Sequence, residues 1–326
     1  MPKAIGGYFE LELRTGQSLY PHAAAFNAAR WAFRALVQAR GLRRVHLPYY
    51  LCGVLVEALE GLNVSVQAYG LDARLEIATP VNLKTDEALL FVNYFGLKSQ
   101  YIDQDLTQRY GQQLIIDNSQ ALFCEAPPGI PTLYSPRKFV GVADGGWLVN
   151  APGNLEPPRP GQSRHRFTAL LGRLEQAPDE HYAAYQACEA SLGDAGIEAM
   201  SDSTRRVLDS IDYLNIARRR IDNLALLRQR LDGLNRFTAW PAHNPPALCY
   251  PLLLDSPQQA AGLRRHLLMQ TIYVPCYWRE VIDSPTAPPF ERHLAECLLP
   301  LPLDQRYDCE AMQRLAEAVI QYERTS

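Results

Sequence analysis

The sequence predicts an α/β protein with a mostly parallel central sheet and a smaller α+β unit toward its C-terminal end. Helical and strand patterns alternate through the first half of the chain, which is typical of parallel sheets. Two segments, "ALLFVN" and "QLIID", are continuously apolar and then turn polar, as strands buried on both faces do. After a Pro- and Gly-rich loop at 151–165 the pattern becomes mainly helical.

The first half is expected to hold helices with strands between them. The ranges are helix 28–42, strand 43–50, helix 52–62, strand 63–72, strand 87–93, helix 102–111, strand 112–117, and two short strands within 131–138 and 145–150. Ligands bind at the carboxyl ends of such parallel strands, so the polar residues that follow each strand are the first candidates for a site.

The second half is expected to begin with helices and to end in a small α+β unit. A long helix at 203–234 has apolar side chains at helical spacing and arginines on its outer face. We expect it to link a large domain at 1–200 to a small domain at 201–326. The remaining ranges are helix 181–193, strand 247–254, helix 256–270, strand 271–278 and helix 308–323.

Composition excludes several classes of protein. The chain has 326 residues and a net charge of −3, so it lacks the basic footprint of a protein that binds nucleic acid or an anionic membrane. No apolar run is long enough to span a bilayer, and the N-terminus lacks a signal-peptide pattern, so a cytoplasmic location is expected. The seven cysteines form no CxxC pair and the seven histidines no HxxxH spacing. We therefore expect reduced thiols and no metal site.

Lys138 is one of only four lysines in the chain, against 28 arginines. Its apolar neighbours predict partial burial, which lowers the pKa of an amine and makes it nucleophilic. Nucleophilic lysines bond to carbonyl compounds, among them pyridoxal phosphate. That cofactor also needs a carboxylate for its ring nitrogen. Asp117, at the end of an apolar strand, is a candidate for this role, although taken alone its position favours the cap of a turn.

The phosphate of such a cofactor needs hydrogen-bond donors, and a helix N-terminus supplies them. The helix that begins in "FNAARWAF" is a candidate, with Asn27 as its cap and the backbone amides of Ala29 and Arg30 in its first turn. The sequence thus predicts an amine, a carboxylate and a phosphate site in its first half.

These motifs resemble the DegT/StrS family of sugar aminotransferases, which are fold-type-I enzymes that use pyridoxal phosphate. The family has an Asp-x-x-Gln motif after a buried strand, and "DNSQ" matches it. A serine, the reactive lysine and a glycine-rich motif follow in the family, and "SPRKFVGVADGG" has the same layout. The likeness continues through "LPYYLC", "VNYFG" and 299–319, and so spans nearly the whole chain.

The resemblance implies a role for each matching residue. Lys138 would bind the cofactor covalently and later carry protons, and Asp117 would pair with the ring nitrogen. Gln120 would contact the phenolic oxygen, and Ser135 would bind the phosphate together with the amides of Ala29 and Arg30. A homodimer with its active site at the interface is also implied, acting on small molecules.

Several positions depart from the family pattern. Ala29 and Arg30 replace Gly-Thr, so Arg30 is a candidate for contacting the phosphate itself. Cys52 stands where an aromatic residue usually stacks on the cofactor, and Tyr50 is a candidate for that face or for simple core packing. Asn93 replaces a histidine. Near the C-terminal end, Tyr277, Trp278 and Arg279 are candidates for lining the entrance or for packing.

The function that the sequence predicts is transfer of an amino group, with glutamate as the expected donor, to a keto sugar or a related metabolite. Two alternatives stay open. One is a lyase or dehydratase that uses the same cofactor on a sugar. The other is a regulator that binds the cofactor or a metabolite without turnover.

Overall fold

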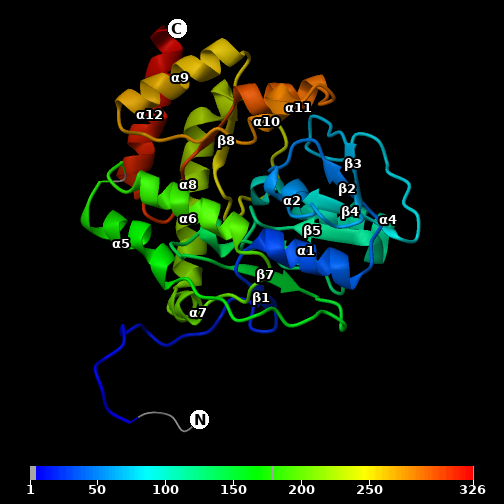
Figure 1. Ribbon diagram of the computed structural model, residues 1–326. Coiled ribbons are helices and arrows are strands. Elements are labelled where there is room, and N and C mark those ends of the chain that lie inside the picture. The colour runs from blue at the N-terminus through cyan, green and yellow to red at the C-terminus, as the bar shows by residue number, and fades with distance from the viewer. Residues whose placement is uncertain (1–4, 178, 326) are drawn as a thin grey trace.

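The structure, a computed structural model that describes residues 5–177 and 179–325, is built around a seven-stranded sheet (Figure 1). The strand order is β1-β7-β6-β5-β4-β2-β3, and only β7 runs antiparallel to its neighbours. The strands are β1 (Ala24–Phe26), β2 (Arg44–Pro48), β3 (Ser65–Tyr69), β4 (Glu87–Val92), β5 (Leu114–Asp117), β6 (Thr132–Tyr134) and β7 (Gly146–Val149). The predicted α/β class and mostly parallel sheet are confirmed.

Helices pack around this sheet and form most of the second half of the chain. The helix α1 lies against β6 and β7, while α12 packs on α8 and α9 (Figure 1). The helices are α1 (Ala29–Ala39), α2 (Val54–Glu57), α3 (Ser99–Tyr101), α4 (Thr107–Tyr110), α5 (Thr168–Glu175), α6 (Tyr182–Asp194), α7 (Asp202–Asp209), α8 (Tyr213–Leu231), α9 (Pro257–Met269), α10 (Glu280–Asp283), α11 (Pro289–Cys297) and α12 (Cys309–Thr325). No helix of the described residues is long and apolar enough to cross a membrane.

A two-stranded antiparallel sheet of β8 (Tyr250–Leu253) and β9 (Leu298–Leu301) forms the centre of the C-terminal unit. One continuous apolar core joins it to the main sheet, because buried residues of α1 and β4 and buried residues of α8, β8 and α12 belong to the same cluster. A second cluster packs Phe139 and Tyr134 against α7 and α8. The boundary between domains at residue 200 stays a prediction.

Two predicted helices are wrong in extent. The helix expected at 52–62 shrinks to the single turn of α2. The long helix expected at 203–234 is broken at 210–212, because the Asp212 carboxylate accepts a hydrogen bond from the Asn215 N–H and so caps the start of α8. Arginines were expected on the outer face of this segment, yet Arg220 of α8 is only 1% exposed.

The strand predicted at 271–278 is also wrong, since this segment has no regular secondary structure and belongs to no sheet. Thr271 and Trp278 have positive φ angles of 59° and 54°, and Pro275 has no N–H to donate. Conversely, β1 and β9 were not expected. The strand β1 has only three residues, which is too short for a clear strand pattern. The strand β9 contains Pro300, and a proline inside a run argues against a strand.

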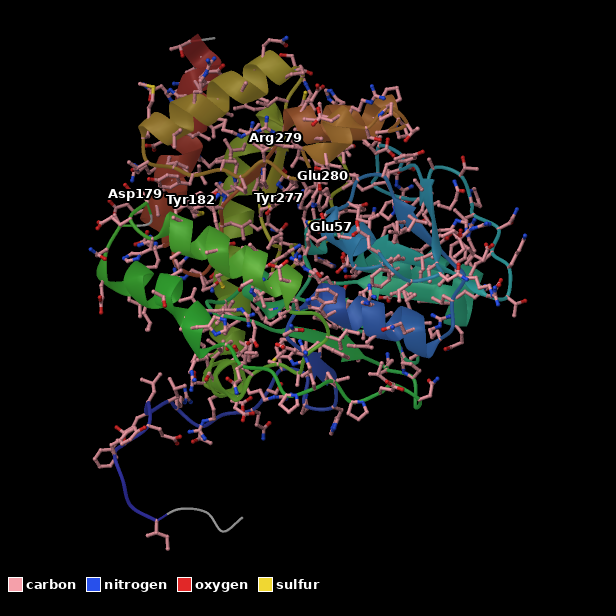
Figure 2. The ribbon with its side chains drawn as sticks, in the orientation of Figure 1. Glu57, Asp179, Tyr182, Tyr277, Arg279 and Glu280 are labelled. Atoms are coloured by element: carbon pink, nitrogen blue, oxygen red, sulfur yellow. The ribbon has the colours of Figure 1, made fainter. Side chains whose placement is uncertain are left out.

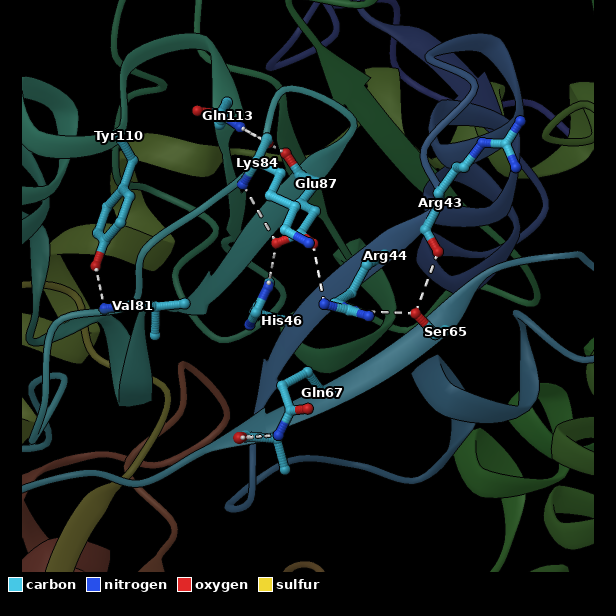
Figure 3. Close-up of polar contacts among 11 residues, drawn as sticks. Arg43, Arg44, His46, Ser65, Gln67, Val81, Lys84, Glu87, Tyr110 and Gln113 are labelled. Carbon is cyan, nitrogen blue, oxygen red and sulfur yellow. Dashed lines mark hydrogen bonds and ion pairs between the residues drawn. The ribbon is translucent and has the colours of Figure 1, made fainter.

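A polar network ties together the start of β4 and its neighbours at the amino edge of the sheet (Figure 3). One oxygen of the buried Glu87 carboxylate lies 3.0 Å from His46 Nε2 and the other 3.0 Å from Arg44 Nη1. The Lys84 N–H also donates to Glu87. The hydrogen bond with His46 holds the pKa of the Glu87 carboxyl below its ordinary value.

We expect Glu87→Gln to destabilise the protein near pH 7 and to change its response to acid. A carboxyl whose pKa is lowered in the folded state contributes stability that is present above its unfolded pKa of about 4.3 and is lost as pH falls through the folded value. The gap in urea midpoint between wild type and variant should therefore narrow below about pH 4.3. The exposed neighbour Asp86 serves as control, and Asp86→Asn should show no such pH-dependent gap.

Candidate active site

The candidate residues from the sequence converge on one edge of the main sheet. Because β1, β2, β4, β5 and β6 are mutually parallel, their carboxyl ends lie at the same edge, where Asn27, Tyr50, Asn93, Asp117 and Ser135 follow them. The antiparallel β7 begins at this edge, so it brings the glycine-rich motif to the same place. This arrangement assembles the predicted amine, carboxylate and helix N-terminus.

The start of α1 has no side-chain cap. Its N-cap residue is Ala28, and no side chain in the described part of the chain accepts a hydrogen bond from the first turn, so the turn keeps donors for a ligand. Asn27 was predicted to be this cap, and that is wrong. Its buried side chain instead donates to the Gly196 carbonyl and accepts from the Glu198 N–H, because these backbone groups run alongside β1.

Gly145 and Gly146 lie directly against this helix start. The Gly145 N–H donates to the Asn27 carbonyl at 2.7 Å, and Gly145 has a φ of +126°. A Cβ on Gly146 would lie 2.3 Å from the Ala29 nitrogen. Gly146 is therefore required for the backbone to approach the first turn of α1, and Gly145 for the positive φ that precedes this approach.

We expect Gly146→Ala to displace the start of α1 and to cost about 1–3 kcal/mol of unfolding free energy, as overpacking does. The clash is with backbone atoms of Ala28 and Ala29, which cannot rotate away. Urea unfolding measures the loss. The matched control is Gly153→Ala, because a Cβ at Gly153 would meet no atom within 4 Å. Equal stability of both variants would contradict the proposed contact.

Asp117 ends β5 and is 6% exposed. Its Oδ1 accepts a hydrogen bond of 2.8 Å from the Ser119 N–H, so the turn-capping role considered from the sequence is present. Gln120 is buried, and its Oε1 accepts from the Phe95 N–H at 2.8 Å. Phe95 has a positive φ of 58°, so Gln120 also supports a strained turn after β4.

Asn93 belongs to a buried amide network. Its Nδ2 donates to Asn118 Oδ1 and to Ser99 Oγ, both at 3.1 Å, while its Oδ1 accepts from the Lys98 N–H. These three bonds use both amide hydrogens of Asn93 and one acceptor lone pair. In this structure Asn93 therefore braces the loops after β4 and β5, next to Asp117.

Lys138 ends a short turn after β6, and its side chain is exposed. Partial burial was predicted from its apolar neighbours, and that is wrong, because Phe139 and Val140 turn into the core while Lys138 points away from it. Ser135, at the start of this turn, is 9% exposed. Next to Lys138, Arg137 forms an ion pair with Glu189 of α6.

Tyr50 and Cys52 lie on the loop after β2. Tyr50 is 1% exposed and packs against Tyr94 and Trp278, with ring centroids 5.8 and 4.3 Å away, which is the core-packing alternative. Cys52 is half-buried. The Gly53 N–H donates to Glu280 Oε1 at 2.9 Å, so the C-terminal unit holds this loop.

The segment 277–280 reaches the start of α2, where Glu280 accepts the hydrogen bond from the Gly53 N–H. In the view of Figure 2, Tyr277 and Glu280 appear between Tyr182 of α6 and Glu57 of α2. A groove of about 810 Å³ runs beside α1, and Arg30 and Glu57 are among its lining residues. The side chain of Arg30 thus faces this groove, on the side of α1 that α2 and α6 flank.

Two residues near the Lys138 turn were missed by sequence reasoning. Arg220 packs on the ring of Phe139, and Gln305 Nε2 donates to the Phe139 carbonyl at 2.7 Å. Arg220 sits in a run of three arginines, which reads as a solvated face, and Gln305 lies in a loop. No signal in the sequence distinguishes either from a surface residue. Within the described residues, no group of three or more His, Cys, Asp or Glu could hold a metal ion.

The sequence matches no family model and no curated protein. Solved structures, however, superpose over nearly the whole chain. TlmJ, an aminotransferase from Streptoalloteichus hindustanus, has a TM-score of 0.66 and 17% identity, covering 93% of this chain and 86% of its own. DesV from S. venezuelae has a TM-score of 0.66 and 17% identity, with coverage of 92% and 84%.

Spr1654 from Streptococcus pneumoniae, in its apo form, has a TM-score of 0.67 and 13% identity, with coverage of 93% and 86%. The chain shares their fold. The fold-type-I architecture that the resemblance implied is therefore confirmed, with its mostly parallel seven-stranded sheet and the small antiparallel sheet.

Proposed function

We propose that this protein is an aminotransferase that uses pyridoxal phosphate and transfers an amino group to a keto sugar or a related metabolite. The observation that carries the proposal is the convergence of Asp117, Lys138 and the uncapped start of α1 on one sheet edge. Support also comes from the folds it resembles, which include the sugar aminotransferase CalS13 from Micromonospora echinospora and structures of Spr1654 in PLP and PMP forms.

The residues at this edge fit the cofactor. No side chain of the described residues is bound to the first turn of α1, and Gly146 places no Cβ against the Ala29 nitrogen, so a phosphate group can approach backbone donors there. Ser135 starts the adjoining turn, and Pro136 lies beside Gly145. The carboxylate of Asp117 and the amine of Lys138 follow neighbouring strands.

When bound, pyridoxal phosphate supplies an aldehyde carbon and an electron-accepting ring. Asp117 would hold a positive charge at the ring nitrogen with the carboxylate oxygen that does not cap the Ser119 turn. Ser135 and the amides of Ala29 and Arg30 would hold the phosphate, and Gln120 would contact the phenolic oxygen. Lys138 would hold the cofactor at its aldehyde carbon, with release of water. Once the amino group of the substrate has displaced it, the free amine would remove and return a proton at the substrate Cα, as a positioned amine base.

Membership of the DegT/StrS family, a cytoplasmic homodimer, and division into domains at 1–200 and 201–326 complete the proposal. Cys52 and Asn93 would border the cofactor, and Tyr50 would support that border from the core. These assignments rest on the motifs in the sequence.

The test is a transamination assay with the purified protein and added pyridoxal phosphate. Individual amino acids, L-glutamate first, are mixed with the protein, and the released keto acid is quantified. We expect about one equivalent of keto acid per subunit without an acceptor, because each cofactor can be aminated once, and continued release when a keto sugar is added. The absence of keto acid from every amino acid would contradict an aminotransferase.

A further inference from the structure

The turn that carries Lys138 is attached to the C-terminal unit through the residue that follows it. Phe139 is 3% exposed, and its carbonyl accepts a hydrogen bond of 2.7 Å from Gln305 Nε2. The guanidinium carbon of Arg220 lies 4.6 Å from the centroid of the Phe139 ring, within the range of a cation–π contact. Both the backbone and the ring of Phe139 are therefore held from outside the main sheet.

Arg220 and Gln305 are also bonded to each other. Arg220 Nε donates to Gln305 Oε1 at 3.2 Å, and Arg220 Nη1 donates to the carbonyls of Ala247 and Leu248 at 3.0 and 3.2 Å. The path from α8 through Gln305 to Phe139 is thus continuous. Both ends of the Gln305 amide are used, so its orientation is fixed.

Burying the guanidinium of Arg220 costs desolvation free energy, and no ion pair of the described residues offsets this cost. No carboxylate of the described residues lies within ion-pair distance of its guanidinium, and its hydrogen-bond partners are neutral. Burial lowers the pKa of Arg220 to about 10, so it remains a cation at neutral pH. A hydrophobic residue would fill this place at a lower desolvation cost.

Among the residues that the structure describes, no hydrogen bond or ion pair holds the side chain of Lys138. Lys138 is exposed, and three backbone hydrogen bonds close its turn, from Lys138 to Ser135 and from Phe139 and Val140 to Pro136. The position of the amine therefore depends on where Phe139 is anchored.

We propose that Arg220 and Gln305 are positioning residues that fix the Lys138 amine for reaction with the cofactor aldehyde, an inference that rests on the proposed function. They touch Phe139 rather than the reacting atoms, so they act through the turn. Loss of the anchor should slow the reaction of the amine, because a displacement of about 1 Å can reduce the rate of a positioned group about a hundredfold.

The experiment measures the rate at which pyridoxal phosphate bonds to Lys138, followed by stopped-flow absorbance and located by borohydride trapping and mass spectrometry. Gln305→Ala removes the contact with the Phe139 carbonyl, and Arg220→Met removes the cation while keeping a long side chain. We expect both variants to react on the order of 10- to 100-fold more slowly than wild type. Arg220→Lys, which keeps the charge over the ring, should recover part of the rate.

Asn235 provides the matched control. It donates to the Pro251 carbonyl and accepts from the Phe237 and Leu253 N–H groups, so it braces the C-terminal unit without a bond to the Gln305 loop or to Phe139. Asn235→Ala should lower thermal stability at least as much as Gln305→Ala while leaving the bonding rate unchanged.

Two results would overturn the inference in distinguishable ways. If wild type bonds to pyridoxal phosphate and Gln305→Ala does so at the same rate, the positioning role is wrong and the proposed function stands. The same holds if Asn235→Ala slows the reaction as much as Gln305→Ala, because the effect then follows stability alone. If wild type itself forms no bond at Lys138, the proposed function fails and the inference fails with it.

Discussion

Lys138→Ala should abolish turnover. The proposed reaction needs an amine that bonds to the aldehyde carbon and later moves a proton at the substrate Cα, and alanine can do neither. Removing a residue that acts at both steps should lower kcat by at least about four orders of magnitude, as the loss of a nucleophile or its base does in other enzymes. Turnover is measured as keto acid released from L-glutamate in the presence of the cofactor and an acceptor.

Two further variants make this result specific. Lys138→Arg keeps the positive charge but should be equally inactive, because a guanidinium stays protonated and is a poor nucleophile. Lys84, which is also exposed but lies at the amino edge of the sheet, is the control, and Lys84→Ala should keep full activity. Full activity of Lys138→Ala would defeat the assignment of the amine.

Asp117→Asn should lower turnover on the order of 10²- to 10³-fold, the usual cost of losing one electrostatic contact in an active site. The substitution removes the negative charge that would face the cofactor ring nitrogen. It keeps Oδ1, which accepts the hydrogen bond from the Ser119 N–H, so the turn after β5 should be preserved. The loss should therefore appear in kcat.

Thermal unfolding of the same variant separates chemistry from folding. Because the capping bond is retained, we expect the unfolding temperature of Asp117→Asn to stay within a few degrees of wild type. An Asp117→Asn protein that is stable and fully active would show that the carboxylate only caps its turn.

The sequence alone predicted the parts of this site that depend on strand order. Apolar runs that end in Asn93 and Asp117 predicted buried parallel strands, and parallel strands place their carboxyl ends at one edge. The glycine-rich motif was noted from the sequence only as part of the family resemblance. The structure places it at the start of α1, where a Cβ on Gly146 does not fit.

The features of the site that the sequence did not predict depend on contacts between segments far apart in the chain. Asn27 was predicted to cap α1. Its side chain instead forms hydrogen bonds with the backbone of 196–198, because the chain at 196–199 runs beside β1. Arg220 was placed on an outer face, but Phe139 and the loop at Gln305 cover it. Helical spacing reports which side of a helix is apolar and cannot report a buried cation bound to carbonyl groups.

The central claim, that Lys138 and its neighbours hold pyridoxal phosphate for transamination, is tested most directly by a visible absorption spectrum of the protein with added cofactor. Wild type and Lys138→Ala are compared before and after L-glutamate. We predict an absorption band in wild type that is absent in Lys138→Ala and that fades when L-glutamate is added, because the amino acid converts the cofactor to its amine form. A wild-type protein whose spectrum equals that of free cofactor, with or without the amino acid, would contradict the claim.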